Sequence, residues 1–308
     1  MAAATDVNPL AAAPTGRRGT AGLWSDAWYR LRRDRLTMAA LAVLLLIVLL
    51  SAVAPLLSDH VFKWRFEQQE LLSAYAKPGL ERPEHLLGAD EIGRSQVVRL
   101  LYGGQVSLLV GFLSASVGLT IGVTVGLIAG YFRGRTDDLI TWFITTFLSI
   151  PGLYLLLIIA ALFRPSPAML IFVLSLFAWP TFALFVRGQT FSLREREFVT
   201  AARTIGASTP RILFRHILPN VMPLIIVLAA TDIGAIILTE SALSYLGLGI
   251  TPPTPSWGNM LTNASAYFVR SWWLVVSPGA MIFLTVLCLY LIGDGLRDAL
   301  DPRLKGAS

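Results

Sequence analysis

Two acidic residues interrupt a long apolar segment of the chain, and they are its clearest candidates for chemistry inside a membrane. Asp232 and Glu240 lie eight residues apart. A carboxylate in a spanning helix is costly to bury, and such groups often relay protons or contact a substrate. The favoured alternative places Glu240 near an interface and turns Asp232 toward a wet cavity or a hydrogen-bond partner. We keep both residues as candidates for lining a transport pathway.

Motifs for ATP hydrolysis, metal binding and nucleophilic catalysis are missing from the sequence. No G-x-x-x-x-G-K-[ST] loop occurs, so we do not expect the chain itself to bind and hydrolyse ATP. The three histidines are scattered and the single cysteine, Cys288, falls in an apolar run, which leaves no zinc set. No G-x-S-x-G elbow is present. We therefore expect no catalytic, cofactor-binding or metal-binding residues, and a membrane enzyme is the weakest hypothesis.

Apolar runs dominate the chain and predict an all-α integral membrane protein. Of its 308 residues, 55% are hydrophobic and 14% are charged, and the mean hydropathy is +0.66. A spanning helix needs about 20 mostly apolar residues, and a lone strand would leave its backbone unpaired in lipid. Six transmembrane helices are predicted: Leu36–Leu57, Val106–Gly130, Leu139–Phe163, Ala168–Val186, Val221–Leu243 and Trp272–Ile292.

The net charge of +6 is explained by membrane topology, so no nucleic-acid partner is expected. With the N-terminus inside, the cytoplasmic segments hold 17 of the 25 lysines and arginines, and the outer segments hold the other 8. This excess follows the positive-inside rule and predicts that both termini are cytoplasmic. The first apolar run is longer than the core of a secretory signal, so we interpret it as an uncleaved span in contact with lipid.

Small residues and a proline shape two of the predicted spans. Glycines recur every four residues in the second span, which brings them to one face and lets another helix approach closely. These helix-packing residues are Gly118, Gly122, Gly126 and Gly130. The third span contains Pro151, which should kink the helix. That kink either serves packing or bends a pathway, so Pro151 joins the pathway candidates.

A polar, arginine-rich segment at about 188–219 separates two apolar spans. Ser192 and Glu195 have the spacing of a capping box, which predicts a helix starting there. An apolar stripe then falls at helical spacing on Phe198, Ala201, Ala202 and Ile205. Gly206 is placed to end this helix. Thr209 and Pro210 should start a second short helix, which is expected to end near Leu218 and Pro219.

The pattern A-A-x-x-x-G followed by L-P in this segment resembles the cytoplasmic coupling loop of ABC importer permeases. Further stretches resemble the dipeptide/oligopeptide permeases, and the C-type subunit most closely. They are HLLGADEIGR at 85–94, AGYF at 129–132, ESALSYLGLG at 240–249, PPTPSWGN at 252–259 and GDGLRDALDPR at 293–303. Together they span residues 30–305. The family usually has Glu before the two alanines, whereas this chain has Thr200, and so lacks the polar contact that Glu would make.

The resemblance implies a type I ABC importer permease fold with cytoplasmic coupling helices. It implies a tail over residues 1–35, a first span with an outer loop over 36–105, a core permease domain over 106–293, and a second tail over 294–308. Docking onto the ATPase is implied for Phe198, Ala201, Ala202, Ile205, Gly206, Leu218 and Pro219. The implied location is the bacterial inner membrane.

The resemblance also implies the partners: a second permease in a heterodimer, two ABC ATPase subunits that use the ATP, and an extracytoplasmic substrate-binding protein. The implied cargo is di- or oligopeptides. Nickel complexes, glutathione and other small solutes remain alternatives within this class. Outside it, an ion-coupled secondary carrier would use Asp232 or Glu240 as its proton site.

Overall fold

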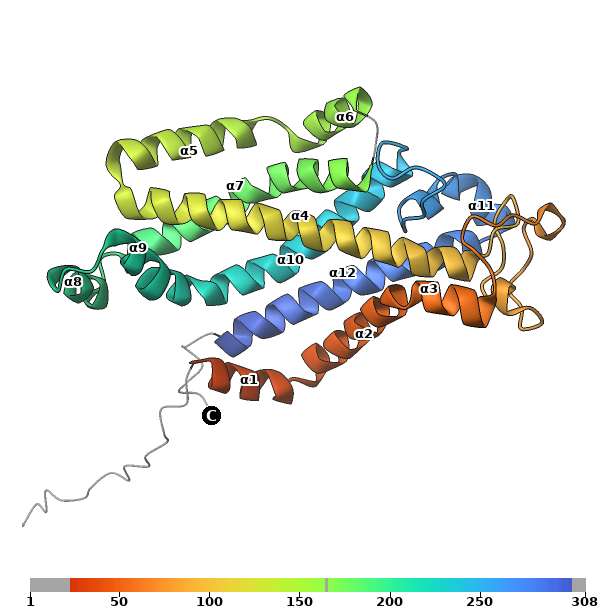
Figure 1. The fold of residues 1–308 in the computed structure, drawn as a ribbon, viewed down its shortest axis with the longest axis horizontal. Helices are drawn as coiled ribbons and strands as arrows, with labels where there is room; N and C mark the ends of the chain where they lie inside the picture. Colours follow the sequence, from red (N-terminus) through yellow and green to blue (C-terminus); the bar gives the residue numbers. More distant parts are fainter. Residues whose placement is uncertain (1–22, 164–165, 301–308) are drawn as a thin grey trace, which may run out of the picture.

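A computed structural model describes residues 23–163 and 166–300 (Figure 1). Apart from one isolated bridge between Ala89 and Ser95, all regular elements in this part of the chain are helices, as the sequence predicts. The α-helices are α1 Leu23–Arg33, α2 Arg35–Ala52, α3 Ala54–Leu57, α4 Gln96–Phe132, α5 Gly134–Ser149, α6 Gly152–Leu162, α7 Pro167–Leu193, α8 Glu197–Thr204, α9 Thr209–Arg211, α10 Leu218–Tyr245, α11 Ala264–Arg270 and α12 Trp273–Leu300. Short 3-10 and π segments are η1 Ser58–Phe62, η2 Leu71–Ser73, η3 Pro83–His85, η4 Ile212–Ile217 and η5 Asn259–Leu261.

Five helices of the described chain are long and apolar enough to cross a membrane. They are α2, α4, α7, the continuous helix Thr209–Tyr245 that contains α10, and α12. The third predicted span is instead divided into α5 and α6, which meet at Ile150 and Pro151. Ile150 is extended, with φ −82° and ψ 123°, because the ring of a following proline disfavours helical geometry. The predicted kink is therefore a full break, and the number of spans stays a prediction.

Close contact between α4 and α7 forms the centre of the fold. A Cβ added at Gly122 would lie 2.5 Å from Phe182 Cβ, and one at Gly126 would lie 2.6 Å from the Ala183 carbonyl oxygen. The other two glycines of the stripe, Gly118 and Gly130, are equally close to α7. Only a residue without a side chain allows this approach of two backbones.

Parts of both predicted tails are helical and pack together. Within the first tail, α1 places Ala27 and Leu31 against Ala299 and Leu300 at the end of α12, and all four side chains are buried. Residues 294–300 therefore continue the last span as a helix and do not form a separate tail. Residues 1–22 and 301–308 of the predicted tails lie outside the described chain.

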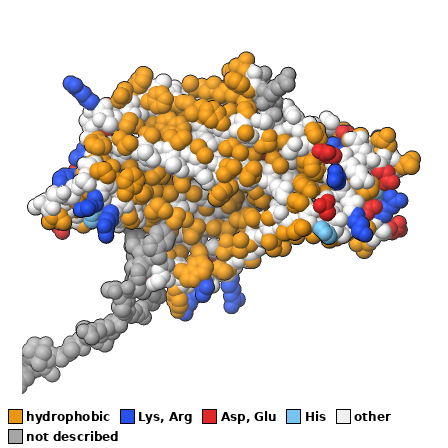
Figure 2. Space-filling model, in the orientation of Figure 1, with side chains coloured by type: hydrophobic (Ala, Val, Ile, Leu, Met, Phe, Trp, Pro, Cys, Tyr) orange, Lys and Arg blue, Asp and Glu red, His pale blue; other side chains and the backbone are white. Residues whose placement is uncertain are grey.

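Side chains are segregated along the molecule. Figure 2 shows hydrophobic side chains over the middle of the visible face, with arginines, lysines and acids gathered toward its two ends. One end carries α8 and α9, and we call residues 194–217 the hairpin end. The other carries the connections before α4 and after α10, and we call residues 58–95 and 246–272 the loop end. An apolar belt between charged ends is the surface expected of a protein embedded in a bilayer.

Candidate functional site

The hairpin end is the first candidate site, and its helix starts later than the sequence predicts. Ser192 belongs to the last turn of α7, and α8 begins at Glu197 after the N-cap Arg196, which makes no side-chain capping bond. The predicted capping box at Ser192 and Glu195 is therefore wrong. Packing of α7 against α4 extends that helix past the local capping signal, since tertiary contacts override propensity.

The end of α8 has the geometry that its glycine predicts. Gly206 has a φ of +80°, which other residues rarely adopt. The Gly206 N–H donates to the Arg203 carbonyl at 3.0 Å, and the Ala207 N–H donates to the Ala202 carbonyl at 3.0 Å. This is the Schellman pattern, and it turns the chain sharply toward α9.

The predicted apolar stripe of α8 is split between two environments. Phe198 and Ile205 are 41% and 84% exposed, and Ala201 is exposed beside them. Ala202 is only 5% exposed and packs, together with the fully buried Val199, in a cluster within the same chain. Ala202 therefore belongs to the foundation of the hairpin, whereas Phe198, Ala201 and Ile205 form its outward face. We call these three residues the exposed stripe.

The second half of the hairpin does not end near Leu218 and Pro219 as predicted. The helix that starts at Thr209 passes through the π segment η4 and continues as α10 to Tyr245. Pro219 lies just after the π segment η4, at a point where the regular α-helical hydrogen-bond pattern is already interrupted. Leu218 is half-buried and Pro219 is exposed. Val199 and Ala202 of α8 pack against Ile212, Leu213 and Ile217, so the exposed stripe lies on a helix that contacts the one running into a span.

Charged contacts join α5, α7 and the hairpin end to one another. Arg187 Nε and Nη2 donate to Asp137 Oδ1 and Oδ2 at 2.5 and 2.7 Å. This pairing holds the pKa of the Asp137 carboxyl below its usual range. Arg194 Nη1 also donates to the Tyr131 carbonyl, and Arg133 Nη2 lies 2.9 Å from Glu195 Oε1.

The acidic pathway candidates lie in different environments. Glu240 is 0% exposed, and it accepts hydrogen bonds from Ser107 Oγ at 3.0 Å and Ser244 Oγ at 2.7 Å. Ser107 Oγ in turn accepts from the Trp257 N–H at 3.2 Å. Glu240 therefore joins α4, α10 and the loop end in an enclosed network, as buried polar groups require. These serine partners were not predicted from the sequence.

Asp232 and Pro151 are more accessible than Glu240. Asp232 is half-buried on α10, and its Oδ2 has no hydrogen-bond partner among the described residues. Pro151 is exposed at the break between α5 and α6. Asp232 and Glu240 share α10, but Asp232 takes no part in the hydrogen bonds that Glu240 makes.

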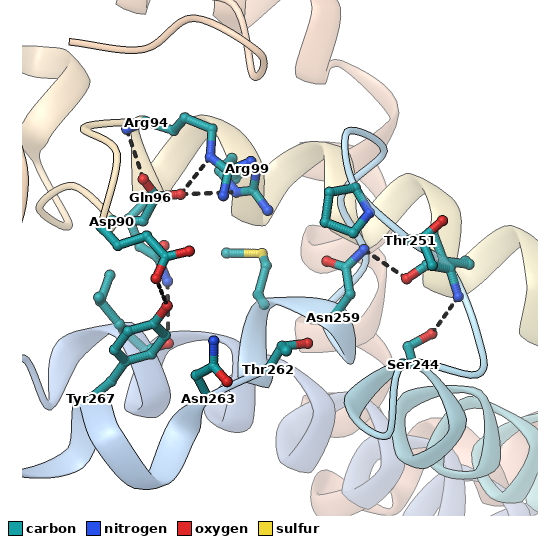
Figure 3. A pocket seen from close by; sticks show the side chains of 16 residues that line it. Asp90, Arg94, Gln96, Arg99, Ser244, Thr251, Asn259, Thr262, Asn263 and Tyr267 are labelled. Atoms are coloured by element: carbon teal, nitrogen blue, oxygen red, sulfur yellow. Dashed lines mark hydrogen bonds and ion pairs between the residues drawn. The ribbon is translucent and has the colours of Figure 1, made fainter. Parts of the chain in front are cut away.

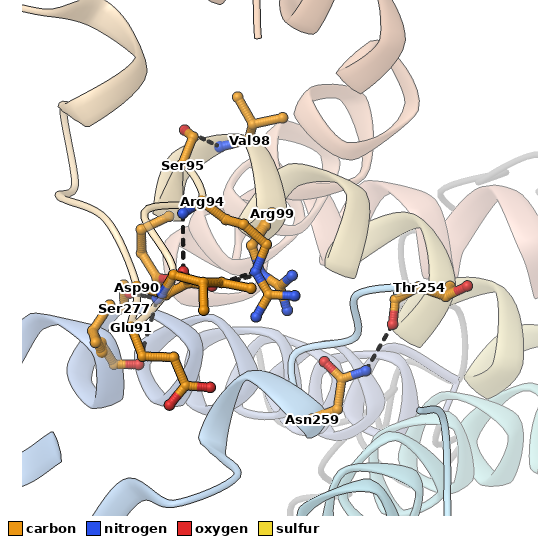
Figure 4. A network of polar contacts seen from close by, with 12 residues as sticks. Asp90, Glu91, Arg94, Ser95, Val98, Arg99, Thr254, Asn259 and Ser277 are labelled. Carbon is orange, nitrogen blue, oxygen red and sulfur yellow. Dashed lines mark hydrogen bonds and ion pairs between the residues drawn. The ribbon is translucent and has the colours of Figure 1, made fainter. Parts of the chain in front are cut away.

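A polar network orders the loop end and was not predicted (Figure 4). Asp90 Oδ1 accepts from the backbone N–H groups of Ile92 and Arg94 at 3.1 and 2.9 Å, and its Oδ2 accepts from Arg94 Nε at 2.6 Å. Tyr267 Oη donates to Glu91 Oε2 at 2.5 Å. Asp90, Glu91 and Arg94 all belong to the motif HLLGADEIGR at 85–94.

Comparison with known proteins identifies relatives that match most of the chain. The family model "Binding-protein-dependent transport system inner membrane component" matches residues 122–306, and "N-terminal TM domain of oligopeptide transport permease C" matches residues 22–78. The oligopeptide transport system permease protein OppC of Haemophilus influenzae is 38% identical over 281 residues, covering 91% of this chain and 89% of the relative. The glutathione transport system permease protein GsiD of Escherichia coli O6:K15:H31 is 39% identical over 283 residues, covering 92% and 91%.

A solved structure shares the fold. The inward-facing MetNI methionine ABC transporter superposes with a TM-score of 0.54 at 19% identity, covering 66% of this chain and 96% of that chain. At this identity the likeness concerns architecture alone. It agrees with the helical membrane fold that the sequence predicts.

Proposed function

The chain belongs to the family of binding-protein-dependent transport system inner membrane components, and we propose that it is one of two transmembrane subunits of an ATP-driven peptide importer. The observation that carries this proposal is the exposed stripe of α8, which stands at one end of an apolar helix bundle on a firmly packed base. Small peptides are the proposed cargo, because OppC is an oligopeptide permease and GsiD a glutathione permease. Glutathione is itself a short peptide and falls within this class.

Members of this family work with ATPases and a binding protein. We propose a specific assembly of such partners for this chain. In it, the chain pairs with a second permease of similar fold, two ATPases dock inside, and a substrate-binding protein delivers cargo outside. The exposed stripe enters a groove on one ATPase, in the manner of an amphipathic helix in a groove. The permease binds no ATP itself, and its partners supply the hydrolysis.

The proposed orientation follows from charge. The hairpin end carries Arg196, Arg203, Arg211 and Arg215 on its exposed surface, and the positive-inside rule assigns such a surface to the cytoplasm. Both termini are then cytoplasmic, and the loop end faces the outside of a bacterial inner membrane. There the loop end is positioned to meet a substrate-binding protein.

The proposed mechanism is alternating access. ATP binding brings the ATPases together and moves the α8 hairpin, and the continuous helix from Thr209 to Tyr245 carries this motion into the bilayer. The anchoring pair Asp137–Arg187 makes α5 and α7 follow the same movement. ATP and cargo drive this change only because they bind the inward-open and outward-open states unequally.

Reconstituted transport tests this function. The complete complex is placed in liposomes so that the hairpin end faces the lumen, and ATP is enclosed in the lumen. Uptake of a radiolabelled dipeptide and of glutathione from the outside is then measured. We expect uptake that requires ATP and the binding protein. Uptake that follows a proton gradient without ATP would identify an ion-coupled carrier instead.

A further inference from the structure

The loop end holds a small cavity lined by both polar and apolar side chains (Figure 3). Its volume is about 160 Å³, and its walls come from the segment before α4, the start of α4, the segment that follows α10, and α11. The residues that matter for its chemistry are Asp90, Glu91, Arg94, Arg99 and Thr262. At this volume the cavity has room for several water molecules or for the end of a small solute.

A buried arginine in this cavity is left without adequate partners. Arg99 is 4% exposed, and Figure 3 shows its guanidinium directed toward the middle of the cavity. Its ionic partner among the described residues is Asp90, with 3.8 Å between Arg99 Nε and Asp90 Oδ2. That separation is too long for a hydrogen bond. Arg99 Nη1 has no hydrogen-bond partner in the described chain.

The acids of the cavity are already engaged by nearer donors. Arg94 Nε lies 2.6 Å from Asp90 Oδ2, and two backbone N–H groups donate to Asp90 Oδ1. Tyr267 Oη donates to Glu91 Oε2 at 2.5 Å. Asp90 Oδ2 is therefore shared between the nearer Arg94 and the more distant Arg99, and Arg99 Nη1 stays without a hydrogen bond in the described chain. Buried polar groups are normally hydrogen-bonded, so an anion from outside the chain would supply the hydrogen bonds that Arg99 lacks.

We propose that this cavity binds the carboxylate group of a small organic solute, with Arg99 as its principal ligand. A guanidinium presents a planar fork of N–H donors that matches the two oxygens of a carboxylate. The same chemistry comes from two sources, the free C-terminus of a peptide or a simple organic acid. This binding site goes beyond the proposed transport function and stands or falls independently of it.

Calorimetry with three small probes tests the site. The full chain is purified in detergent together with the subunits that copurify with it, and is titrated with acetate, glycylglycine and glycylglycine amide. We expect saturable binding of at least one carboxylate and at least tenfold weaker binding of the amide. Affinity for glycylglycine at least tenfold above that for acetate assigns the site to peptide ends, whereas equal affinities show that the carboxylate alone is recognised.

Variants connect the binding to this cavity. Arg99→Gln should weaken carboxylate binding at least tenfold. Arg270→Gln is the matched control, because Arg270 is an exposed loop-end arginine that lies over the Tyr75 ring, 5.5 Å from its centroid, and does not line the cavity. It should bind like wild type. Thr262 is exposed and lines the cavity, so the larger side chain of Thr262→Phe should fill the cavity while Arg99 stays in place. This variant tests the site even if Arg99→Gln fails to fold.

Three results would overturn the proposal. One is the absence of saturable binding of either carboxylate to the wild-type protein. Another is equal binding of glycylglycine and its amide. The third is unchanged affinity in a folded Arg99→Gln or Thr262→Phe variant, with folding judged by the elution profile and the thermal unfolding curve.

Discussion

Arg187 and Asp137, 50 residues apart in sequence, form a two-pronged ion pair that joins α7 to the start of α5. Asp137 is 7% exposed, so the pair is shielded from water on one side. Hydrogen bonds to a charged group contribute about 1.5–3 kcal/mol each. The pair therefore fixes the broken helix α5–α6 to the bundle at the end where the hairpin lies.

Removing the carboxylate should loosen this contact in a pH-dependent way. Because the hydrogen bonds from Arg187 hold the pKa of Asp137 below its usual range, the pair stabilises the fold at neutral pH. That contribution is lost as the pH falls through the lowered pKa. Asp137→Asn should lower the thermal unfolding temperature at pH 7, by an amount that corresponds to about 1.5–3 kcal/mol. The deficit should shrink as the pH approaches 3.

Thermal unfolding in detergent at pH 3, 5 and 7 measures this difference. Asp138→Asn is the control, because Asp138 is exposed next to Asp137 and makes no hydrogen bond to Arg187. An Asp137→Asn protein as stable as wild type at pH 7 would show that the pair contributes nothing.

The glycine stripe of α4 should not tolerate any side chain. Gly122→Ala places a methyl group 2.5 Å from both Phe182 Cβ and the Trp179 carbonyl oxygen, and overpacking of this kind costs about 1–3 kcal/mol. Gly122→Leu and Gly126→Leu should abolish assembly of the complex. Gly188→Ala is the matched control, because an added Cβ there meets no atom within 4 Å. The yield of assembled complex on size exclusion is the measurement, and equal yields for Gly122→Leu and Gly188→Ala would contradict the packing.

Substitutions at the neighbouring Ala201 and Ala202 of α8 should affect docking and folding differently. Ala201→Arg adds bulk and charge to the exposed stripe, so the protein should insert and remain stable while the ATPase no longer copurifies. Ala202→Arg forces a charge into the cluster around Val199, and burying an unpaired charge costs several kcal/mol, so the chain itself should unfold locally. Wild-type transport with Ala201→Arg would exclude ATPase docking at this face.

Cysteine labelling tests the proposed orientation. In a Cys288→Ala background, Gln69→Cys at the loop end should react with a membrane-impermeant maleimide added outside intact cells. Thr204→Cys at the hairpin end should react only after the membrane is opened. Both positions are exposed in the folded chain. The reverse pattern would invert the topology and remove the cytoplasmic assignment of α8.

Much of this protein is determined by its sequence. The apolar runs predict helices because lipid leaves the backbone no other partners, and α2, α4, α7, α10 and α12 follow those runs closely. Gly206 ends α8 because few other residues accept its positive φ. Motifs spread over most of the chain identify the permease family, which the comparisons confirm.

Tertiary structure decides which side of each helix is buried and which side is exposed. Phe198, Ala201, Ala202 and Ile205 share one stripe in sequence, yet only Ala202 is turned inward, because the cluster at the base of the hairpin sets the rotation of α8. Glu240 is likewise enclosed by Ser107, a residue more than a hundred positions away. Arg94 and Arg99 share the Asp90 carboxylate, with Arg94 Nε at 2.6 Å and Arg99 Nε at 3.8 Å from the same oxygen. Such outcomes depend on contacts between distant segments, and helical periodicity, which is local, carries no information about them.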